Sequence, residues 1–228
     1  MSQQPEIIEY YEQLATAYDE NRFGNSYGQF VHKREYDILY PILTNSTGVT
    51  VNVACGTGRF MEFADIGIDA SKGMIFQAQK KHPKKSFAVA DTTNLPFENE
   101  SVDTIICLHL FMHLPLESIN KIISEFHRVL KPEGLIIFDY PSSARRKIRV
   151  PNEQKWHGQT TLTPRWIADY HGIDWEIIQH QGILYVPIQR VPNNLRKHFI
   201  QLDKACGRLL PVHHAQYIIS TLKKNTAP

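Results

Sequence analysis

The sequence contains no apolar run long enough to cross a lipid bilayer. A membrane-spanning helix needs about 20 consecutive apolar residues, whereas Lys, Asp, His or Pro interrupts every candidate stretch here. The first residues, Met-Ser-Gln-Gln-Pro-Glu, also lack the basic start and apolar centre of a secretory signal peptide. We therefore expect no membrane span, no export signal and a cytoplasmic location.

Cysteine is scarce as well. Cys55, Cys107 and Cys206 are widely spaced and odd in number, which argues against a disulfide scaffold and favours free thiols in a reducing compartment. They also lack the close spacing of a metal site, and the 11 histidines form no ligand pattern, so we expect no metal. Because no repeats or low-complexity tracts occur, the 228 residues fit a single domain.

Charge is distributed unevenly along the chain, although the net charge is only +2. Residues 1–139 hold 12 basic and 18 acidic side chains, whereas residues 140–228 hold 13 and 5. The densest basic cluster consists of Arg145, Arg146, Lys147 and Arg149. A solvated loop explains this cluster, and attraction of an anionic substrate, a nucleic acid or an acidic lipid surface would explain it too.

Hydrophobic periodicity predicts alternating helices and strands. Helices are expected at residues 6–21, 28–43, 72–81, 116–130, 163–171 and 193–210, and strands at 49–53, 65–69, 86–90, 102–108, 135–140, 173–180 and 215–222. Residues 141–162 show little periodicity and are expected to form a long loop or lid. This alternation predicts an α/β fold with a doubly wound sheet.

The segment Val49–Gly58 is the most informative part of the sequence. Alternating valines predict a buried strand, and Gly56 and Gly58 remove the Cβ atoms that would keep the backbone away from a ligand. Asp69 ends the next strand, where its carboxylate can accept hydrogen bonds from two ribose hydroxyls. The helix between the two strands must be unusually short, since the second strand begins near Asp65. This layout predicts a nucleoside-bearing cofactor at the carboxyl edge of the sheet.

The run Asn52-Val-Ala-Cys-Gly-Thr-Gly58 resembles the first motif of class I S-adenosylmethionine-dependent methyltransferases. The usual motif reads hydrophobic-Leu-Asp-hydrophobic-Gly-Cys-Gly-Thr-Gly. Asn52 stands where the family has Asp, and Ala54 stands where it has Gly, as in relatives that resemble quinone-biosynthesis methyltransferases. A dinucleotide fingerprint fits less well, because Met61 occupies the third glycine position and the acid follows too soon.

Four later segments also resemble this family and follow the order of its fold, over about residues 7 to 140. They are Ser86-Phe-Ala-Val-Ala-Asp91 with Leu95-Pro-Phe97, Ser101-Val-Asp-Thr-Ile-Ile-Cys-Leu-His109, His113-Leu114, and Leu130-Lys-Pro-Glu-Gly-Leu-Ile-Ile-Phe138. The resemblance implies a Rossmann-like sheet of seven strands, mostly parallel with the last strand antiparallel, plus N-terminal helices. It divides the single domain into a helical cover (1–45), a cofactor-binding core (46–140), an acceptor-pocket or lid region (141–192) and a final helix and strand (193–228).

The resemblance implies S-adenosyl-L-methionine as cofactor, with Asp69 on the ribose and Asp91 on the adenine. The expected cofactor-binding residues are Tyr18, Asn52, Ala54, Cys55, Gly56, Gly58, Asp69, Ala70, Asp91, Thr92, Leu108 and His109. His113 is the first candidate for a general base and Asp139 the second, since both lie at the carboxyl edge of the sheet. An oxygen acceptor needs such a base, whereas a nitrogen or carbon acceptor need not have one.

A small-molecule acceptor is the leading expectation for the substrate. An aromatic wall around it is expected from Tyr11, Phe23, Phe111, Trp156, Trp166, Tyr170 and Tyr185, although more of these are expected in the core. Methylation of tRNA or another nucleic acid is an alternative, motivated by the basic C-terminal third. A cofactor-binding regulatory protein without catalysis is a further alternative, motivated by Asn52 and the short first connection. The sequence does not indicate an oligomeric state.

Overall fold

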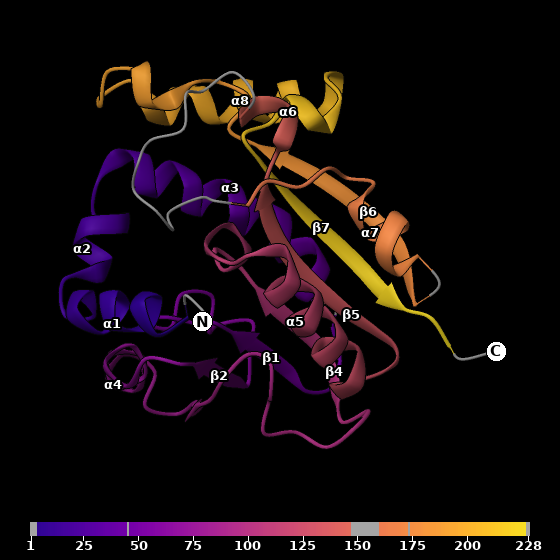
Figure 1. Ribbon diagram of the computed structural model, residues 1–228. Coiled ribbons are helices and arrows are strands. Elements are labelled where there is room, and N and C mark those ends of the chain that lie inside the picture. The colour runs from indigo at the N-terminus through magenta and orange to yellow at the C-terminus, as the bar shows by residue number, and fades with distance from the viewer. Residues whose placement is uncertain (1–3, 45, 147–159, 173, 227–228) are drawn as a thin grey trace.

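The computed structural model describes residues 4–44, 46–146, 160–172 and 174–226. Its centre is one seven-stranded sheet in the order β3-β2-β1-β4-β5-β7-β6, with helices on both faces (Figure 1). The strands are β1 (Thr50–Val53), β2 (Ile66–Asp69), β3 (Ser86–Val89), β4 (Val102–Cys107), β5 (Leu130–Pro141), β6 (Trp175–Ile183) and β7 (Tyr217–Lys224). Strands β1 to β5 run parallel, and β7 lies antiparallel between β5 and β6. The predicted fold class is confirmed.

Eight α-helices surround the sheet in the described part of the chain. They are α1 (Gln4–Leu14), α2 (Tyr18–Phe23), α3 (Ser26–Leu43), α4 (Lys72–Lys81), α5 (Leu116–Val129), α6 (Ser143–Arg146), α7 (Trp166–His171) and α8 (Ile200–Leu209). Short 3₁₀ helices cover Phe111–His113, Ile188–Arg190, Arg196–Phe199 and Val212–His214. As predicted, the Ser71 side chain caps α4 by accepting a hydrogen bond from the Met74 amide.

The central strands are buried on both faces, because successive residues of a strand point to opposite sides of the sheet. Ile105 of β4 and Ile136 of β5 belong to the core cluster that α5 covers. The next residues, Ile106 and Ile137, belong to the cluster that α3 covers. A continuous apolar run therefore serves two cores, and the polar ends of the strands are left at the edge of the sheet.

The predicted helix over residues 6–21 is interrupted. Helix α1 ends at Leu14, the chain turns, and α2 begins at Tyr18. The Asp19 carboxylate accepts a hydrogen bond from Thr57 Oγ1 (2.6 Å) and forms an ion pair with Lys81 of α4. These contacts fix the direction of α2 and override the helical periodicity of the sequence.

The short helix expected after Gly58 is absent, and residues 57–62 form turns instead. Phe60 has a φ angle of 67°, which an α-helix of L-residues cannot contain without a clash of its Cβ atom. The Asn52 side chain donates to the Arg59 carbonyl (2.8 Å), which satisfies a polar group that a helix would have paired. Helix α3 and the Phe60 ring cover the sheet face that the short connection leaves bare.

Other elements also differ in extent from the predictions. Strand β5 begins at Leu130, directly after α5, and its pairing with β4 resumes at Leu135 after a bulge in which Glu133 has a φ angle of 65°. Helix α7 begins at Trp166 rather than at Thr163, because residues 163–166 form a turn. The predicted helix over 193–210 is split into a 3₁₀ turn and α8. Residues 147–159 of the expected lid lie outside the described residues.

Candidate functional site

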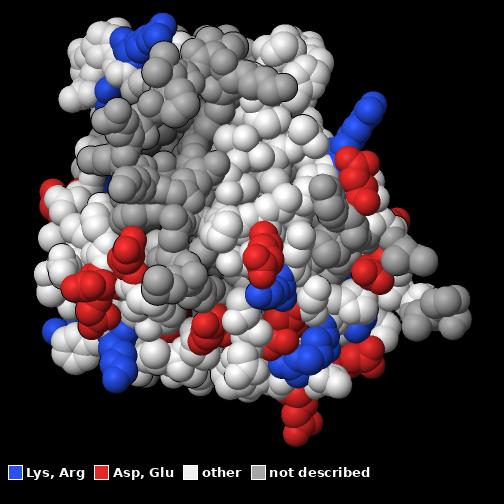
Figure 2. All heavy atoms as spheres, in the orientation of Figure 1, with Lys and Arg blue, Asp and Glu red and all other residues white. Residues whose placement is uncertain are grey.

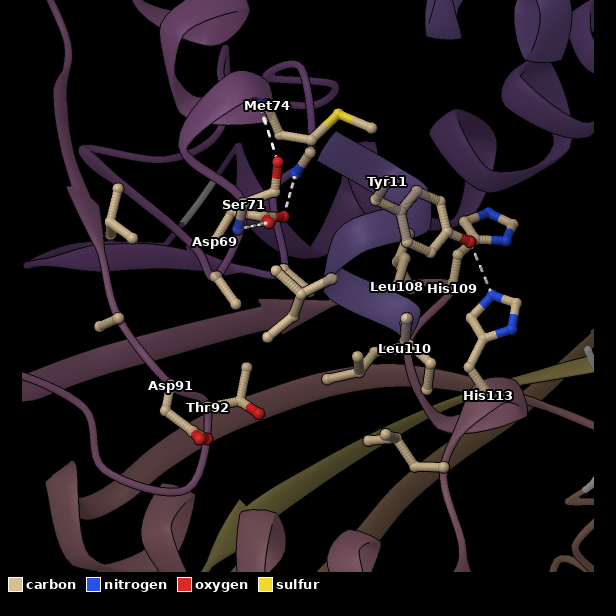
Figure 3. Close-up of a pocket in the computed structure, with 18 of the residues that line it drawn as sticks. Tyr11, Asp69, Ser71, Met74, Asp91, Thr92, Leu108, His109, Leu110 and His113 are labelled. Carbon is tan, nitrogen blue, oxygen red and sulfur yellow. Dashed lines mark hydrogen bonds between the residues drawn. The ribbon is translucent and has the colours of Figure 1, made fainter. Parts of the chain in front are cut away.

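A cavity of about 300 Å³ opens at the carboxyl ends of β1, β2 and β4, the place where open α/β sheets bind ligands (Figure 3). Helix α1 and Tyr18 of α2 cover it. The lining includes Tyr18, Ala54, Gly56, Asp69, Ala70, Asp91, Thr92, Leu108, His109 and His113. The structure thus gathers most of the predicted site residues around this first cavity. It adds apolar contacts from Ile7, Ile8, Met74, Leu110 and Leu114.

The glycine turn after β1 leaves room for a ligand. Ala54 and Gly56 both have left-handed backbones, with φ angles of 55° and 54°. A Cβ atom built on Gly56 would meet no atom within 4 Å, so this backbone faces open space in the cavity wall. A bound group can therefore come close to the main chain here.

Asp69 holds the turn in place. Its Oδ2 accepts a hydrogen bond from the Gly56 amide (2.8 Å), and its Oδ1 accepts one from the Ser71 amide (2.9 Å). Burial raises the pKa of Asp69, and these amide bonds offset part of that shift. Each carboxylate oxygen keeps a second lone pair, so a diol at the cavity wall can donate to it.

Helix α1 is fastened across the cavity by a contact that the sequence did not predict. The Glu12 carboxylate accepts hydrogen bonds from Ser71 Oγ (2.6 Å) and from the Gly73 amide (2.9 Å). The bond from Ser71 is the main cause of a lowered pKa of Glu12. A negative charge at the start of α4 also suits the helix dipole.

A second cavity of about 250 Å³ adjoins the first. Four residues line both cavities: Tyr11, Tyr18, His109 and His113. The rest of its lining comes from α2, the start of α3, Met112, Leu184 and Tyr217. Two ligands placed in these cavities would meet at the shared residues.

His113 and Tyr11 form a hydrogen bond where the cavities meet. The distance from Tyr11 Oη to His113 Nε2 is 2.9 Å (Figure 3). Burial raises the pKa of Tyr11, so its hydroxyl stays protonated at neutral pH. A neutral phenol beside an imidazole can pass a proton from a ligand to the ring.

His109 is held between two buried carboxylates. Its Nε2 lies 2.6 Å from Glu35 Oε1 of α3, and its main-chain amide donates to Asp139 Oδ1 at the end of β5 (2.5 Å). Arg59 forms an ion pair with the other oxygen of Glu35. Neither Glu35 nor Asp139 lines either of these two cavities, so Asp139 lies behind His109 rather than at a cavity wall.

The charges of this group balance when His109 is protonated. Burial by itself would lower the pKa of His109, but Glu35 and Asp139 raise it above its ordinary value. Burial would raise the pKa of Glu35, yet Arg59 and His109 lower it to about 2. Burial also raises the pKa of Asp139, partly offset by His109.

Glu35, His109 and Asp139 are the one group of three side chains in the described residues whose ligand atoms are close enough to surround a metal ion. Arg59 already pairs with Glu35, and Glu35 and Asp139 raise the pKa of His109, which favours the protonated imidazole. Metal binding needs neutral histidine and unpaired carboxylates. The donor set therefore fits a proton better than a metal ion.

Comparisons with known proteins decide the family. A family model described as a methyltransferase domain matches residues 51–138. An uncharacterised methyltransferase of Oceanobacillus iheyensis is 31% identical over 140 residues, covering 58% of this chain and 66% of that protein. A ubiquinone/menaquinone biosynthesis C-methyltransferase of Campylobacter jejuni is 30% identical over 152 residues, covering 60% and 64%. The matched segment is a methyltransferase domain of the class I S-adenosylmethionine-dependent family.

The fold extends the likeness beyond the matched segment. The structure of an S-adenosylmethionine-dependent methyltransferase from Thermotoga maritima matches with a TM-score of 0.68 at 17% identity, covering 95% of this chain and 98% of that chain. The sequence matches span just under two thirds of the two curated relatives. S-adenosylmethionine is the cofactor of this family, and the first cavity offers the space beside Gly56 and the Asp69 carboxylate that such a molecule needs.

Three predicted cofactor residues lie beside the first cavity without lining it. Asn52 is buried and donates to the Arg59 carbonyl. Cys55 packs with Met61 and Ile75 on the far side of the turn, and burial raises the pKa of its thiol. Gly58 lies against α4, where a Cβ atom would come within 2.8 Å of His82. These residues stabilise the turn on the side that faces away from the first cavity.

The expected aromatic wall is divided between cavity and core. Tyr11 and Phe23 line the second cavity. Phe111, Trp166 and Tyr185 are buried in the body of the protein. Trp156 and the side chain of Tyr170 lie outside the described residues.

The basic C-terminal third forms no broad positive surface among the described residues in view. On the face shown in Figure 2, acidic and basic side chains are interspersed. Of the expected basic cluster only the Arg145 side chain is described, and it donates to the Tyr185 carbonyl (3.2 Å). No helix in the described residues is long and apolar enough to span a membrane.

Sequence reasoning missed Glu35 as part of the site. Arg34 and Glu35 continue the buried stripe that Phe30, Ile38 and Leu39 define on α3. Charged residues on the apolar face of a helix need buried partners. The place of Glu35 on the buried face of the predicted helix could therefore have marked it as a residue with a buried charged partner.

Proposed function

We propose that this protein transfers a methyl group from S-adenosylmethionine to a small-molecule acceptor. The observation that carries the proposal is the meeting of two cavities at Tyr11, Tyr18, His109 and His113. The cofactor occupies the first cavity and the acceptor the second. Transfer between two bound molecules depends chiefly on holding them in line.

The roles of the cofactor residues follow from their places. Asp69 accepts hydrogen bonds from the ribose hydroxyls, and Asp91 with Thr92 borders the adenine end. Gly56 and Ala54 let the methionine portion approach the turn. Tyr18 and helix α1, which the Glu12–Ser71 hydrogen bond holds in place, cover the first cavity and exclude water from it.

The acceptor is activated by the pair of His113 and Tyr11. When bound, S-adenosylmethionine would supply an electrophilic methyl group whose bonding pair stays with sulfur on transfer. The proton of a hydroxyl acceptor passes to Tyr11 Oη as Tyr11 gives its own to His113 Nε2. Tyr11 therefore returns to its neutral form, which its raised pKa favours.

Asp139 is a positioning residue in this proposal, rather than a base. It accepts the hydrogen bond from the His109 main chain and, with Glu35, stabilises the imidazolium. A charged His109 attracts an acceptor that carries negative charge and repels one that carries positive charge. His109 thus helps to orient the acceptor and to select it by its charge.

The test is formation of S-adenosylhomocysteine with a panel of phenols, carboxylic acids, amines and quinols, measured by mass spectrometry. We expect turnover with at least one acceptor, lowered by about two orders of magnitude in His113→Gln for a hydroxyl acceptor. Tyr11→Phe removes the hydroxyl and should lower turnover too. Cofactor binding without any methylated product across the panel would favour a non-catalytic binding protein.

A further inference from the structure

The second cavity carries an imbalance of charge in its lining. Its described lining contains Arg22 and His109 but no aspartate or glutamate. Glu35 and Asp139 lie behind His109, where they balance His109 and Arg59. No carboxylate of the described residues pairs with Arg22.

The Arg22 side chain makes no hydrogen bond or ion pair with the described residues. It is exposed at the cavity wall, and its charge lowers the pKa of both Tyr11 and Tyr18 against the larger effect of burial. Its guanidinium therefore acts on the two tyrosines that separate the cavities. An arginine in such a position can bind a carboxylate or phosphate in a forked geometry.

The start of α3 adds positive potential to the same cavity. Asn25, Tyr27 and Gly28 line the cavity at the N-terminus of this 18-residue helix. The helix dipole places partial positive charge there. The Tyr27 and Gly28 amides already donate to Asn25, so they are not available to bind a ligand directly. The helix dipole therefore contributes only a positive electrostatic potential in the cavity.

The remaining lining is mainly aromatic and apolar. Tyr11, Tyr18, Phe23, Tyr27 and Tyr217 supply rings, with Val31, Met112 and Leu184 between them. Tyr18 contacts Tyr11 and Phe23 edge to face, at centroid distances of 5.9 Å and 6.0 Å. Such walls favour a flat apolar body, and about 250 Å³ limits it to a small one.

We propose that the second cavity selects a small acceptor with a planar apolar body and one anionic group, and that Arg22 binds that group. This inference rests on the proposed function for the placement of the acceptor. It names the acceptor class and adds Arg22 as a residue that determines specificity. A carboxylate and a phosphate share the required chemistry.

The experiment uses four probes of similar size: 4-hydroxybenzoate, phenyl phosphate, the neutral 4-hydroxybenzamide and the cationic tyramine. Dissociation constants are measured by NMR titration, with and without saturating S-adenosylhomocysteine. We expect an anionic probe to bind at least about tenfold more tightly than the neutral or cationic probe. The two anions show whether a carboxylate or a phosphate fits better.

Arg22→Gln should abolish the preference for the anion by weakening its binding about tenfold while leaving 4-hydroxybenzamide unchanged. Arg22→Lys, which keeps the charge but not the fork, should fall between the two. Arg208→Gln is the matched control, because Arg208 is exposed on α8, carries the same charge and lines neither cavity.

Equal or tighter binding of the neutral or cationic probe would overturn the inference, as would equal effects of Arg22→Gln and Arg208→Gln. Failure to bind S-adenosylhomocysteine would instead overturn the proposed function. The titrations without S-adenosylhomocysteine would still decide the charge preference of the second cavity.

Discussion

His109 adopts a left-handed backbone, with a φ angle of 63°, where β4 ends and the two cavities meet. Such a conformation is costly for a residue with a side chain. Here the Asp139 carboxylate binds the His109 amide and the Glu35 carboxylate lies against its ring. The same two contacts that hold the backbone also determine the charge of the imidazole.

Glu35→Gln is expected to lower the pKa of His109. The substitution removes the negative charge 2.6 Å from Nε2, and burial then favours the neutral ring. The pKa is measured by NMR titration of the His109 ring. Glu117→Gln removes an exposed carboxylate that pairs only with Lys121 and should leave His109 unchanged. A raised pKa of His109 that persists in Glu35→Gln would contradict this account.

The acid stability of the protein should reflect Glu35. Its folded-state pKa of about 2 lies below the value of about 4.3 in an unfolded chain. Its ionisation therefore stabilises the fold fully above pH ~4.3, and this stabilisation is lost as the pH falls toward 2. Urea unfolding should show a stability difference between the protein and Glu35→Gln that shrinks between pH 5 and about pH 3. A stability difference that stays constant over this pH range would contradict the lowered pKa of Glu35.

The corner between α2 and α3 explains how short elements build the second cavity. A Cβ atom on Gly28 would lie 1.9 Å from the Arg22 carbonyl oxygen, so the two helices can approach only at a glycine. This approach brings Arg22, Phe23 and Tyr27 into one wall. Hydrophobic periodicity does not predict this close approach of α2 and α3, since glycine in a helix only indicates a low helix propensity.

Gly28→Ala is expected to separate α2 from α3 and to lower the free energy of unfolding by about 1–3 kcal/mol. It should also weaken binding in the second cavity more than cofactor binding. Stability is measured by urea denaturation and binding by NMR titration. Gly207→Ala should cost less, because its Cβ would come no closer than 3.3 Å to the Tyr185 ring. Similar losses in the two variants would refute the argument.

At the scale of the whole molecule, the alternation of strands and helices predicted the doubly wound α/β class, and the family resemblance implied a mostly parallel sheet of seven strands with the last one antiparallel. The turns at residues 57–62 and the break before Tyr18 were not predicted, because they depend on particular side-chain contacts that periodicity does not encode: Asn52 with the Arg59 carbonyl, and Asp19 with Thr57 and Lys81. The first cavity was largely foreseen from its motif. The second cavity and Glu35 arise from the packing of α2 and α3, which no local pattern encodes.

A buried ion pair joins the N-terminal and C-terminal parts of the fold. Arg34 Nε of α3 donates to Asp203 Oδ2 of α8 (2.8 Å), and Asp203 also accepts from the Leu184 and Val186 amides. Asp203→Ala would leave the buried Arg34 without its carboxylate partner, with only the long hydrogen bond to the Gly182 carbonyl (3.5 Å), and should lower the free energy of unfolding by about 3–5 kcal/mol in urea denaturation.

Asp37→Ala is the control for that substitution. Asp37 lies on the same helix as Arg34 but pairs with the more exposed Lys33 and Lys204. Its loss should cost about 1 kcal/mol or less. Equal costs for the two substitutions would show that α3 and α8 are not joined through Asp203.

Calorimetric titration with S-adenosylmethionine and S-adenosylhomocysteine tests the central claim most directly, namely that the first cavity is a cofactor site. The account predicts saturable binding of both, weakened at least about tenfold in Asp69→Ala. Asp103→Ala is the control, because Asp103 pairs with Lys131 and lines neither cavity. Absence of binding to the unaltered protein, or equal binding to Asp69→Ala, would contradict the account.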